Sequence, residues 1–228
     1  MWDEEKILCQ ELPDDVAEFL TRSIEKLSED VKSSLRILSC FGASLSIAVI
    51  EALERALGIN LVDSLDVAVA EGLLDKKDDQ YRFAHDRIQE AAYNTVSPLK
   101  RCLVHFNYGL ELSSLLIEDE GANDSVLFTA VNQLNLGGPP AVQVHSQYLT
   151  AAKLNLRAGK KAMGMSDYEI AYSYFDSGIS FLRKKHWQEH WQEHYTLSLE
   201  LFGLAAKCAL TKGDHVSLKH LSGEVVTK

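Results

Sequence analysis

The sequence predicts a mainly α-helical protein that contains one small β-hairpin. Apolar residues recur at steps of three and four along most of the 228 residues, which is the spacing of one helix face. The period changes to two in one place, GLLDKKDDQYRFAH (residues 72–85), where Tyr81 and Phe83 alternate with Arg82 and Ala84. Glycines and prolines separate the helical runs.

The first helices are predicted from residues that share a helix face. In chain order these residues are Val16, Leu20, Ile24, Leu27, Val31, Leu35, Leu38 and Phe41. Gly42 is expected to end this run. SIAVIEALERAL (residues 46–57) predicts the next helix, which Gly58 ends. Residues 61–71 predict a third helix, followed by Gly72.

The hairpin and the helix after it are predicted from turn and cap signals. A polar turn at residues 76–80 joins two short strands. Asp86 is expected to cap the next helix, because Asp is a preferred N-cap residue and Gln89 lies three residues on, as in a capping box. That helix is predicted to run to Val96, and Pro98 ends it.

Residues 30–97 therefore read as three helices, a hairpin and a fourth helix, which is the order of a winged-helix domain with the hairpin as its wing. Residues 1–29 are predicted to form an N-terminal lead-in helix. Residues 98–136 are predicted to form connecting helices, with an apolar stripe of Leu99, Leu103, Phe106, Leu110 and Ile117. The two glycines and two prolines of NLGGPPAV (135–142) mark the clearest break.

The last part, residues 141–228, is predicted to be an antiparallel array of helix pairs like tetratricopeptide repeats. In that repeat a small residue lets two helices approach, and an aromatic ring fills the gap. Residues close to this spacing are Gly159, Ala162, Ala171, Tyr174, Phe175 and Gly178, with a weaker return at Ala206, Ala209, Gly213 and Leu218.

Composition and charge weigh against several classes of protein. The formal net charge is -10, which disfavours a general binder of nucleic acid or anionic membranes. No run of about 18 apolar residues is present, and the acidic N-terminus does not resemble a signal peptide. The four cysteines, Cys9, Cys40, Cys102 and Cys208, are scattered, which predicts reduced thiols and a cytoplasmic location.

No catalytic signature is found, so we predict that this chain is not an enzyme by itself. RAGKK (157–161) is the stretch nearest to a P-loop, but Leu154 stands in place of the first glycine and Lys161 in place of the Ser or Thr. Nucleophile elbows of the form GxSxG, HExxH pairs and CxxC pairs are also missing.

A tandem copy of four residues, HWQEHWQEHY (186–195), is the most unusual stretch. On a helix it stacks three histidines at steps of four, His186, His190 and His194, and two histidines at that step can chelate a divalent ion. No Cys or carboxylate close in sequence completes a site, although Glu189 and Glu193 could help on the surface. We therefore interpret the stretch as a lengthened helix whose Trp187 and Trp191 pack on a neighbour, and we predict no metal site.

A winged helix suggests DNA binding, in which the third helix carries basic residues to phosphates. Here residues 61–71 contain Asp63, Asp66 and Glu71 and no Lys or Arg. Residues 43–84 hold four basic and eight acidic side chains. Each phosphate would meet repulsion, so we expect no nucleic-acid partner.

Three segments taken in order, YRFAHDRIQEAAY (81–93), FTAVNQLNLG (128–137) and AKLNLRAGKKA (152–162), resemble the region after the ATPase head in STAND-type signalling ATPases of the AAA class. Many proteins of this family join a protein-kinase domain, the head, a winged helix and helical repeats to sensor and output domains. The resemblance spans about residues 30–215. The head and its P-loop are missing here, so the resemblance implies ATP or ADP only in the full-length protein, and no cofactor in this chain.

The resemblance also implies a role for His85 and Asp86. In related STAND ATPases a His-Asp pair lies where the wing meets the next helix, and its histidine contacts a phosphate of bound ADP. His85 and Asp86 match that pair, and no catalytic residue is implied. The alternative is that Asp86 only caps the helix while His85 packs beside the wing.

The function expected from these observations is regulatory. The chain would be a non-catalytic interaction module that transmits the nucleotide state of an ATPase head to output domains of the same or another protein, and that binds other proteins through its helical repeats. Neither a nucleic acid nor a membrane is an expected partner. The first alternative is a winged-helix transcription regulator with a helical effector-sensing domain. The second is a metal-dependent enzyme, which a completed ligand set around residues 186–194 would have favoured.

Overall fold

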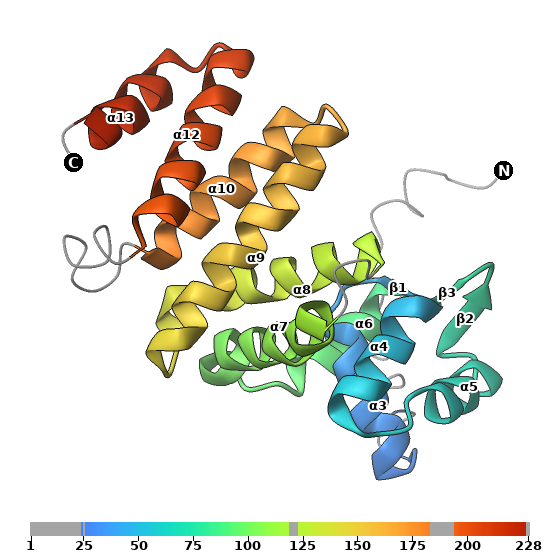
Figure 1. Cartoon of the computed structure of the whole chain (residues 1–228). Helices are drawn as coiled ribbons and strands as arrows, with labels where there is room; N and C mark the ends of the chain where they lie inside the picture. Colours follow the sequence, from blue (N-terminus) through green and yellow to red (C-terminus); the bar gives the residue numbers. More distant parts are fainter. Residues whose placement is uncertain (1–23, 25, 119–122, 183–193, 227–228) are drawn as a thin grey trace, which may run out of the picture. The chain divides into compact units, whose positions relative to one another are not determined.

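The computed structural model describes residues 24, 26–118, 123–182 and 194–226. Within these residues the chain forms ten α-helices and one three-stranded antiparallel sheet (Figure 1), so the predicted mainly helical class is confirmed. The chain divides into two compact units, Met1–Arg101 and Cys102–Lys228, which we call the N-terminal unit and the C-terminal unit.

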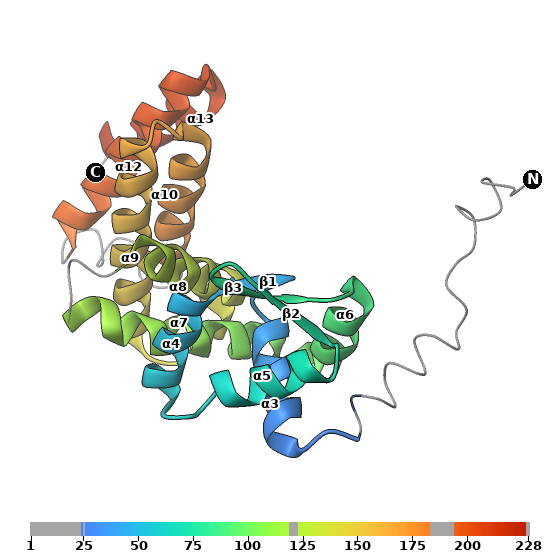
Figure 2. The same cartoon turned by 90° about the vertical axis from the view of Figure 1, so that its right-hand side faces the viewer.

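In the described part of the N-terminal unit, residues 24 and 26–101, four helices combine with the sheet (Figure 2). In chain order its elements are α3 (Glu29–Ser39), β1 (Ser44–Ser46), α4 (Ile47–Leu57), α5 (Val62–Ala70), β2 (Leu74–Lys77), β3 (Gln80–Phe83) and α6 (Asp86–Asn94). Helix α3 packs against both α5 and α6, and α5 packs against β2. The centre of the core consists of fully buried side chains, among them Leu35, Leu38, Ile50, Leu53, Leu65 and Tyr81.

The sheet has the order β1-β3-β2, so β3 is its central strand. The β2–β3 hairpin turns at Asp78, whose φ of 53° lies in the left-handed region that Asp tolerates better than most residues. Strand β1 pairs with β3 through Leu45 opposite Tyr81. The sequence predicted the hairpin but not β1, because three residues are too few to show a strand period.

Helix ends in this unit are satisfied by side chains and by one glycine. The Ser28 hydroxyl accepts a bond from the Val31 N–H at the start of α3. Gly58 ends α4 at a φ of 66°, as predicted for a C-terminal glycine. The Glu54 carboxylate of α4 accepts bonds from the N–H groups of Leu61 and Val62, at 2.7 and 2.8 Å, and so caps α5 from a distance.

The C-terminal unit is entirely helical in the part that the structure describes. A 3-10 turn at Pro98–Lys100 precedes it. Its helices are α7 (Arg101–Glu118, which begins one residue before the unit), α8 (Asp124–Gly137), α9 (His145–Gly164), α10 (Tyr168–Leu182), α12 (Tyr195–Lys212) and α13 (His215–Val226). The described helices α8, α9, α10, α12 and α13 pack mainly on those that come directly before or after them in this order. Leu99 was predicted to lie on the apolar stripe of α7, but it lies in the 3-10 turn and is 96% exposed. That prediction is wrong, because Pro98 starts a turn before the helix begins.

Glycines allow the closest contacts between these helices. A Cβ atom on Gly159 of α9 would lie 2.4 Å from the Phe175 ring of α10, and one on Gly137 of α8 would lie 2.5 Å from Cβ of Phe106 on α7. Both aromatic rings are fully buried. The contact of Gly159 with Phe175 is the arrangement of small and aromatic residues that the sequence predicted for this helix pair.

Buried polar side chains link the same helices. The amides of Asn135 on α8 and Asn155 on α9 donate to each other's oxygens, both at 2.9 Å, and Asn155 is fully buried. The hydroxyl of Tyr174 on α10 donates to the Asn132 oxygen of α8 at 3.0 Å. These bonds satisfy groups whose burial would otherwise cost stability, so they fix the register of α8, α9 and α10.

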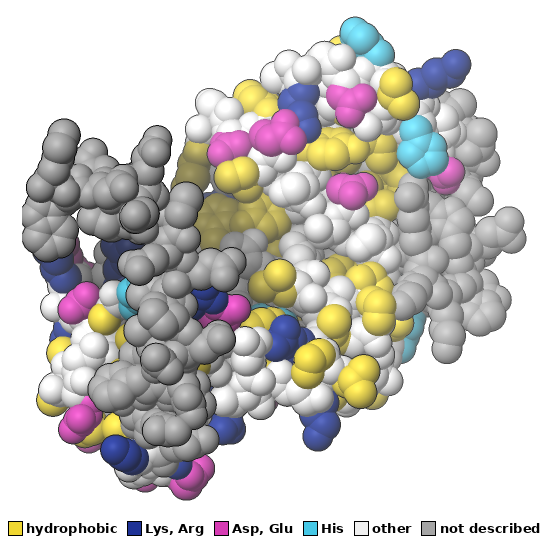
Figure 3. Space-filling view, turned by 180° about the vertical axis from the view of Figure 1, so that it is seen from behind, with side chains coloured by type: hydrophobic (Ala, Val, Ile, Leu, Met, Phe, Trp, Pro, Cys, Tyr) yellow, Lys and Arg dark blue, Asp and Glu magenta, His cyan; other side chains and the backbone are white. Residues whose placement is uncertain are grey.

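Further features of the described residues are the mixed character of the surface, the state of the cysteines and the hydropathy of the helices. Hydrophobic, acidic and basic side chains are interspersed on the face seen in Figure 3. Cys40, Cys102 and Cys208 form no disulfide with one another, and Cys9 lies outside the described residues. Burial raises the pKa of the Cys40 thiol to about 11. In the described ranges, no helix has the length and apolar character needed to cross a membrane.

Candidate functional site

The candidate site is the junction between β3 and α6, where the sequence places His85 and Asp86. Backbone bonds fix the strand as it leaves the sheet, since the N–H of Phe83 donates to the Ala43 oxygen and the N–H of Ala84 donates to the Leu73 oxygen, at 2.9 and 3.1 Å. Phe83 before the junction and Ile88 after it are buried. The four residues between them, 84–87, are exposed.

His85 caps the helix, and Asp86 does not. The backbone of His85 is extended, with φ −151° and ψ 142°, and its ring Nδ1 accepts a bond from the Arg87 N–H at 3.1 Å. Asp86 is already the first residue of α6. The predicted Asp86 cap is therefore wrong, because the chain stays extended for one residue longer than the sequence pattern indicated. The Asp86 carboxylate still lies at the positive end of the helix dipole.

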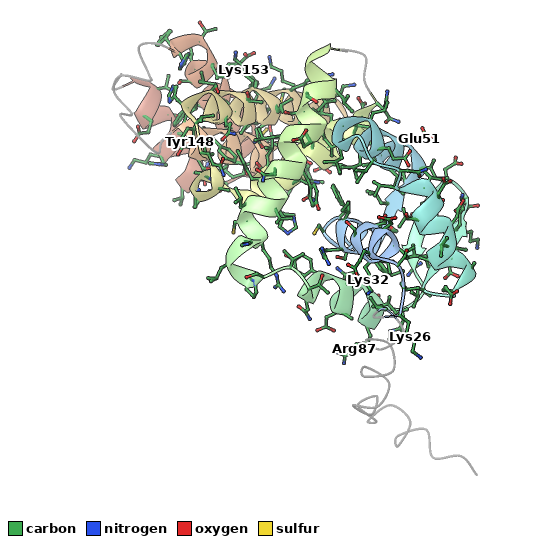
Figure 4. All side chains as sticks on the ribbon, turned by 90° about the horizontal axis from the view of Figure 1, so that it is seen from below. Lys26, Lys32, Glu51, Arg87, Tyr148 and Lys153 are labelled. Atoms are coloured by element: carbon green, nitrogen blue, oxygen red, sulfur yellow. The ribbon has the colours of Figure 1, made fainter. Side chains whose placement is uncertain are left out.

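The predicted capping box is also wrong. The side-chain amide of Gln89 donates to the Ser39 backbone oxygen at 3.0 Å, and so it ties α6 to α3 instead of returning to the helix start. Arg87, labelled in Figure 4, pairs with Glu90 one turn along the exposed side of α6, at 3.0 Å. The junction is thus held by the His85 ring, by Gln89 and by the buried residues on either side.

The hydrogen bond to His85 determines which ring nitrogen carries the proton. Because Nδ1 accepts from a backbone N–H, the proton of the neutral ring is assigned to Nε2. Among the described residues, Nε2 has no hydrogen-bond partner. His85 therefore presents an N–H donor from an exposed position at the start of α6, and such a donor can bind an anion.

A groove of about 590 Å³ lies beside this junction, lined by β2, β3 and residues 84–86. Its charged side chains are of both signs, namely Lys76, Lys77, Arg82, Asp75, Asp78 and Asp86. Within the described part of the chain, Lys77 and Arg82 form no ion pair. An anionic group in this groove would thus find two cations and the His85 donor, although Asp75, Asp78 and Asp86 would oppose it.

A second cluster, which the sequence did not reveal, connects α5 to the hairpin. The hydroxyl of buried Tyr81 donates to Asp66 at 2.5 Å, and Lys76 pairs with the same oxygen at 2.9 Å. Hydrogen bonds from Tyr81 and Lys76 lower the pKa of Asp66. Hydrogen bonds to Tyr81 and Asp66 raise the pKa of Lys76 to about 12, and burial raises the pKa of Tyr81. One carboxylate of the acidic α5 is therefore neutralised within the protein.

The lowered pKa of Asp66 predicts a loss of stability in acid. Because the pKa of Asp66 is lower in the folded chain than in the unfolded chain, its ionised carboxylate stabilises the fold. This stabilisation is fully present above the pKa of the unfolded chain, about 4, and is lost as the pH falls through the pKa of the folded chain. We expect Asp66→Asn to destabilise the protein at neutral pH and to flatten the decline of stability below about pH 4. The measurement is urea unfolding from neutral to acid pH. Glu71→Gln is the control, because Glu71 is exposed and has no side-chain partner among the described residues; equal pH profiles for Asp66→Asn and the wild type would contradict the prediction.

The remaining predicted sites divide between those that the structure describes and those that it does not. His186, His190, Trp187 and Trp191 lie outside the described residues. Among the residues that are described, no group of three or more His, Cys, Asp or Glu side chains is placed to hold a metal ion. Helix α5 exposes Asp63 and Asp66, as the sequence predicted, but the Asp66 carboxylate is paired with Lys76.

Comparison with known proteins returned no match: no model of a protein family, no curated protein sequence and no solved structure matches this chain.

Proposed function

We propose that this chain is a non-catalytic regulatory and protein-interaction module of a STAND-type signalling ATPase. The N-terminal unit would be the winged helix, and its order of helices, sheet and final helix supports this. The C-terminal unit would be the tetratricopeptide-like array, which the neighbour-to-neighbour packing of its helices and the Gly159–Phe175 contact support. The module would act in the cytoplasm, beside an ATPase head that binds ATP or ADP, and would bind neither nucleic acid nor membrane.

The observation that carries this proposal is the hydrogen bond between His85 Nδ1 and the Arg87 N–H. It holds the ring in one orientation and one tautomer, so that Nε2–H is left as a donor beside the groove of β2 and β3. A docked head would bring a nucleotide phosphate to this donor, and Lys77 and Arg82 would add positive charge. His85 would then stabilise the ADP-bound, closed state. Asp86, next to it, would favour the helix start through its charge.

His85→Asn tests the Nε2–H donor separately from the N-cap of α6. His85→Ala would remove both the cap and the donor. Asn is a preferred N-cap residue, so the start of α6 is kept, whereas the Nε2–H donor is lost. In the full-length protein with its head, we expect stability to change by less than about 0.5 kcal/mol. We expect ADP to be bound about tenfold to a hundredfold more weakly, because a hydrogen bond to a charged group contributes about 1.5–3 kcal/mol. Melting temperature and the rate of ADP release are the two measurements.

Asp86→Asn is the matched control for that experiment. It removes a charge from the helix start, at a cost of about 0.3–1 kcal/mol, and it leaves the His85 donor in place. ADP release should therefore be no faster than in the wild type, because the substitution removes a negative charge that opposes a phosphate in the groove. Unchanged ADP release in His85→Asn would refute the role of His85. A full-length sequence without a P-loop upstream of this region would refute the assignment to a STAND-type ATPase.

A further inference from the structure

The exposed face of α9 is entirely cationic over its central turns. Between Ala151 and Lys161, the side chains that are not buried are Lys153, Arg157, Lys160 and Lys161. The other seven positions are buried, including Gly159 against Phe175 and Asn155 against Asn135. Every position of this stretch that reaches solvent is thus basic, in a chain whose net charge is -10.

These four cations line a groove of about 490 Å³, whose other lining residues are Leu156 and Gly164. Nothing lies within 4 Å of the place where Gly164 would carry a Cβ, so this end of the groove is open. Lys160 pairs with Glu200 of α12 and Lys161 pairs with Asp124 of α8, both at 2.5 Å. Arg157 donates to the Leu116 oxygen of α7 at 3.1 Å. Three of the cations are therefore held in position by neighbouring helices.

Lys153 differs from the other three. It is exposed, and among the described residues it has no ion-pair or hydrogen-bond partner. Figure 4 labels it on α9, on the same helix as Tyr148. Lys160 and Lys161 each have one carboxylate, so the groove as a whole holds four positive charges against two negative ones.

Apolar surface lies on the neighbouring helix. Next to Glu200 on α12, Leu199 is 37% exposed, and Leu210, three helical turns further along the same side, is 58% exposed. Gly203 lies between them with open space around it. A ligand that spans the Lys160–Glu200 pair would thus meet positive charge on α9 and aliphatic side chains on α12.

We propose that this face of the C-terminal unit binds an acidic peptide that carries aliphatic residues. Carboxylates of the peptide would pair with Lys153 and with the ordered cations of the groove, and leucine-like side chains would contact Leu199 and Leu210. Glu200 and Asp124 at the edge of the groove select against nucleic acid, whose evenly spaced phosphates would meet them. This proposal gives the partner chemistry for the interaction role proposed above, on which it rests, and it does not depend on His85.

The test uses the chain of residues 1–228 and a fluorescent ten-residue peptide of eight glutamates and two leucines. A matched peptide carries glutamine in place of each glutamate. We expect the acidic peptide to bind, the neutral peptide not to bind, and the affinity to fall as salt rises from about 0.05 to about 0.3 M, since exposed charges are screened over that range. Fluorescence anisotropy gives the dissociation constant.

Lys153→Glu should weaken binding by about fivefold or more, because it replaces an attractive contact with a repulsive one. Lys219→Glu on α13 makes the same change of net charge at another exposed lysine and should leave binding unchanged. Circular dichroism would verify that both variants remain folded. Equal weakening by the two variants, or no binding of the acidic peptide, overturns the proposal, as does tighter binding of a DNA duplex or of anionic vesicles. The outcome of the peptide experiment does not affect the measurement of ADP release in His85→Asn. Unchanged ADP release in that variant would likewise leave the peptide-binding proposal open to its own test.

Discussion

Gly159→Ala is expected to lower the free energy of unfolding of the C-terminal unit by about 1–3 kcal/mol, which is the usual cost of inserting a methyl group into a packed core. The new Cβ would lie 2.4–2.8 Å from three atoms of the Phe175 ring. That ring is fully buried and cannot turn aside, so α9 and α10 would have to separate. Urea unfolding followed by circular dichroism measures the loss.

Gly203→Ala provides the matched control for this prediction. Gly203 is also inside a helix of the same unit, but nothing lies within 4 Å of its added Cβ. The substitution should stabilise the unit by about 0.5–1 kcal/mol, because alanine loses less conformational freedom than glycine in a helix. Combining Gly159→Ala with Phe175→Leu should recover part of the lost stability. Similar effects of the two alanines would show that close helix packing is not what requires glycine at position 159.

Asn135→Ala is the second substitution with a large expected effect. Asn155 is 0% exposed. In this variant its side-chain oxygen would lose the hydrogen bond that the Asn135 amide now donates to it at 2.9 Å. A buried polar group without a partner costs about 1–3 kcal/mol, and we expect a loss of that size in urea unfolding. The Asn155 N–H group would keep its bond to the Ala151 oxygen at 3.0 Å.

A double-mutant cycle tests the same pair more strictly. Asn155→Ala should also destabilise the unit, but the double variant Asn135→Ala, Asn155→Ala should cost less than the sum of the two, because no buried amide is then left without a partner. A coupling energy above about 0.5 kcal/mol would support the role of the amide pair. Additive losses would mean that each asparagine contributes only through its own packing.

Local sequence patterns predicted the helices well because each depends on neighbours within one or two turns. The period of apolar residues in 46–57 and the glycine after it place α4 to within one residue. The small and aromatic residues of 159–178 likewise predicted a close helix contact, and Gly159 makes it with Phe175. Features of this kind are set by spacing along the chain, so one sequence is enough to find them.

Features that depend on distant residues were missed or misassigned. Strand β1 has three residues, and only its pairing with β3, some 36 residues later, makes it a strand. The cluster of Asp66, Tyr81 and Lys76 joins positions that no spacing rule connects. At the candidate site the sequence located the junction, but Gln89 turns toward Ser39 on another helix, and the cap moved from Asp86 to His85.

The sheet also couples two parts of the N-terminal unit mechanically. The Ile47 N–H, at the first residue of α4, donates to the Asp79 oxygen at the tip of the hairpin, at 2.9 Å. Strand β1 immediately before it is paired along β3. Movement of the hairpin therefore also moves α4. Helix α4 is in turn bonded to the start of α5 through the Glu54 carboxylate. A displacement of the hairpin tip would therefore be transmitted to α4 and to the start of α5.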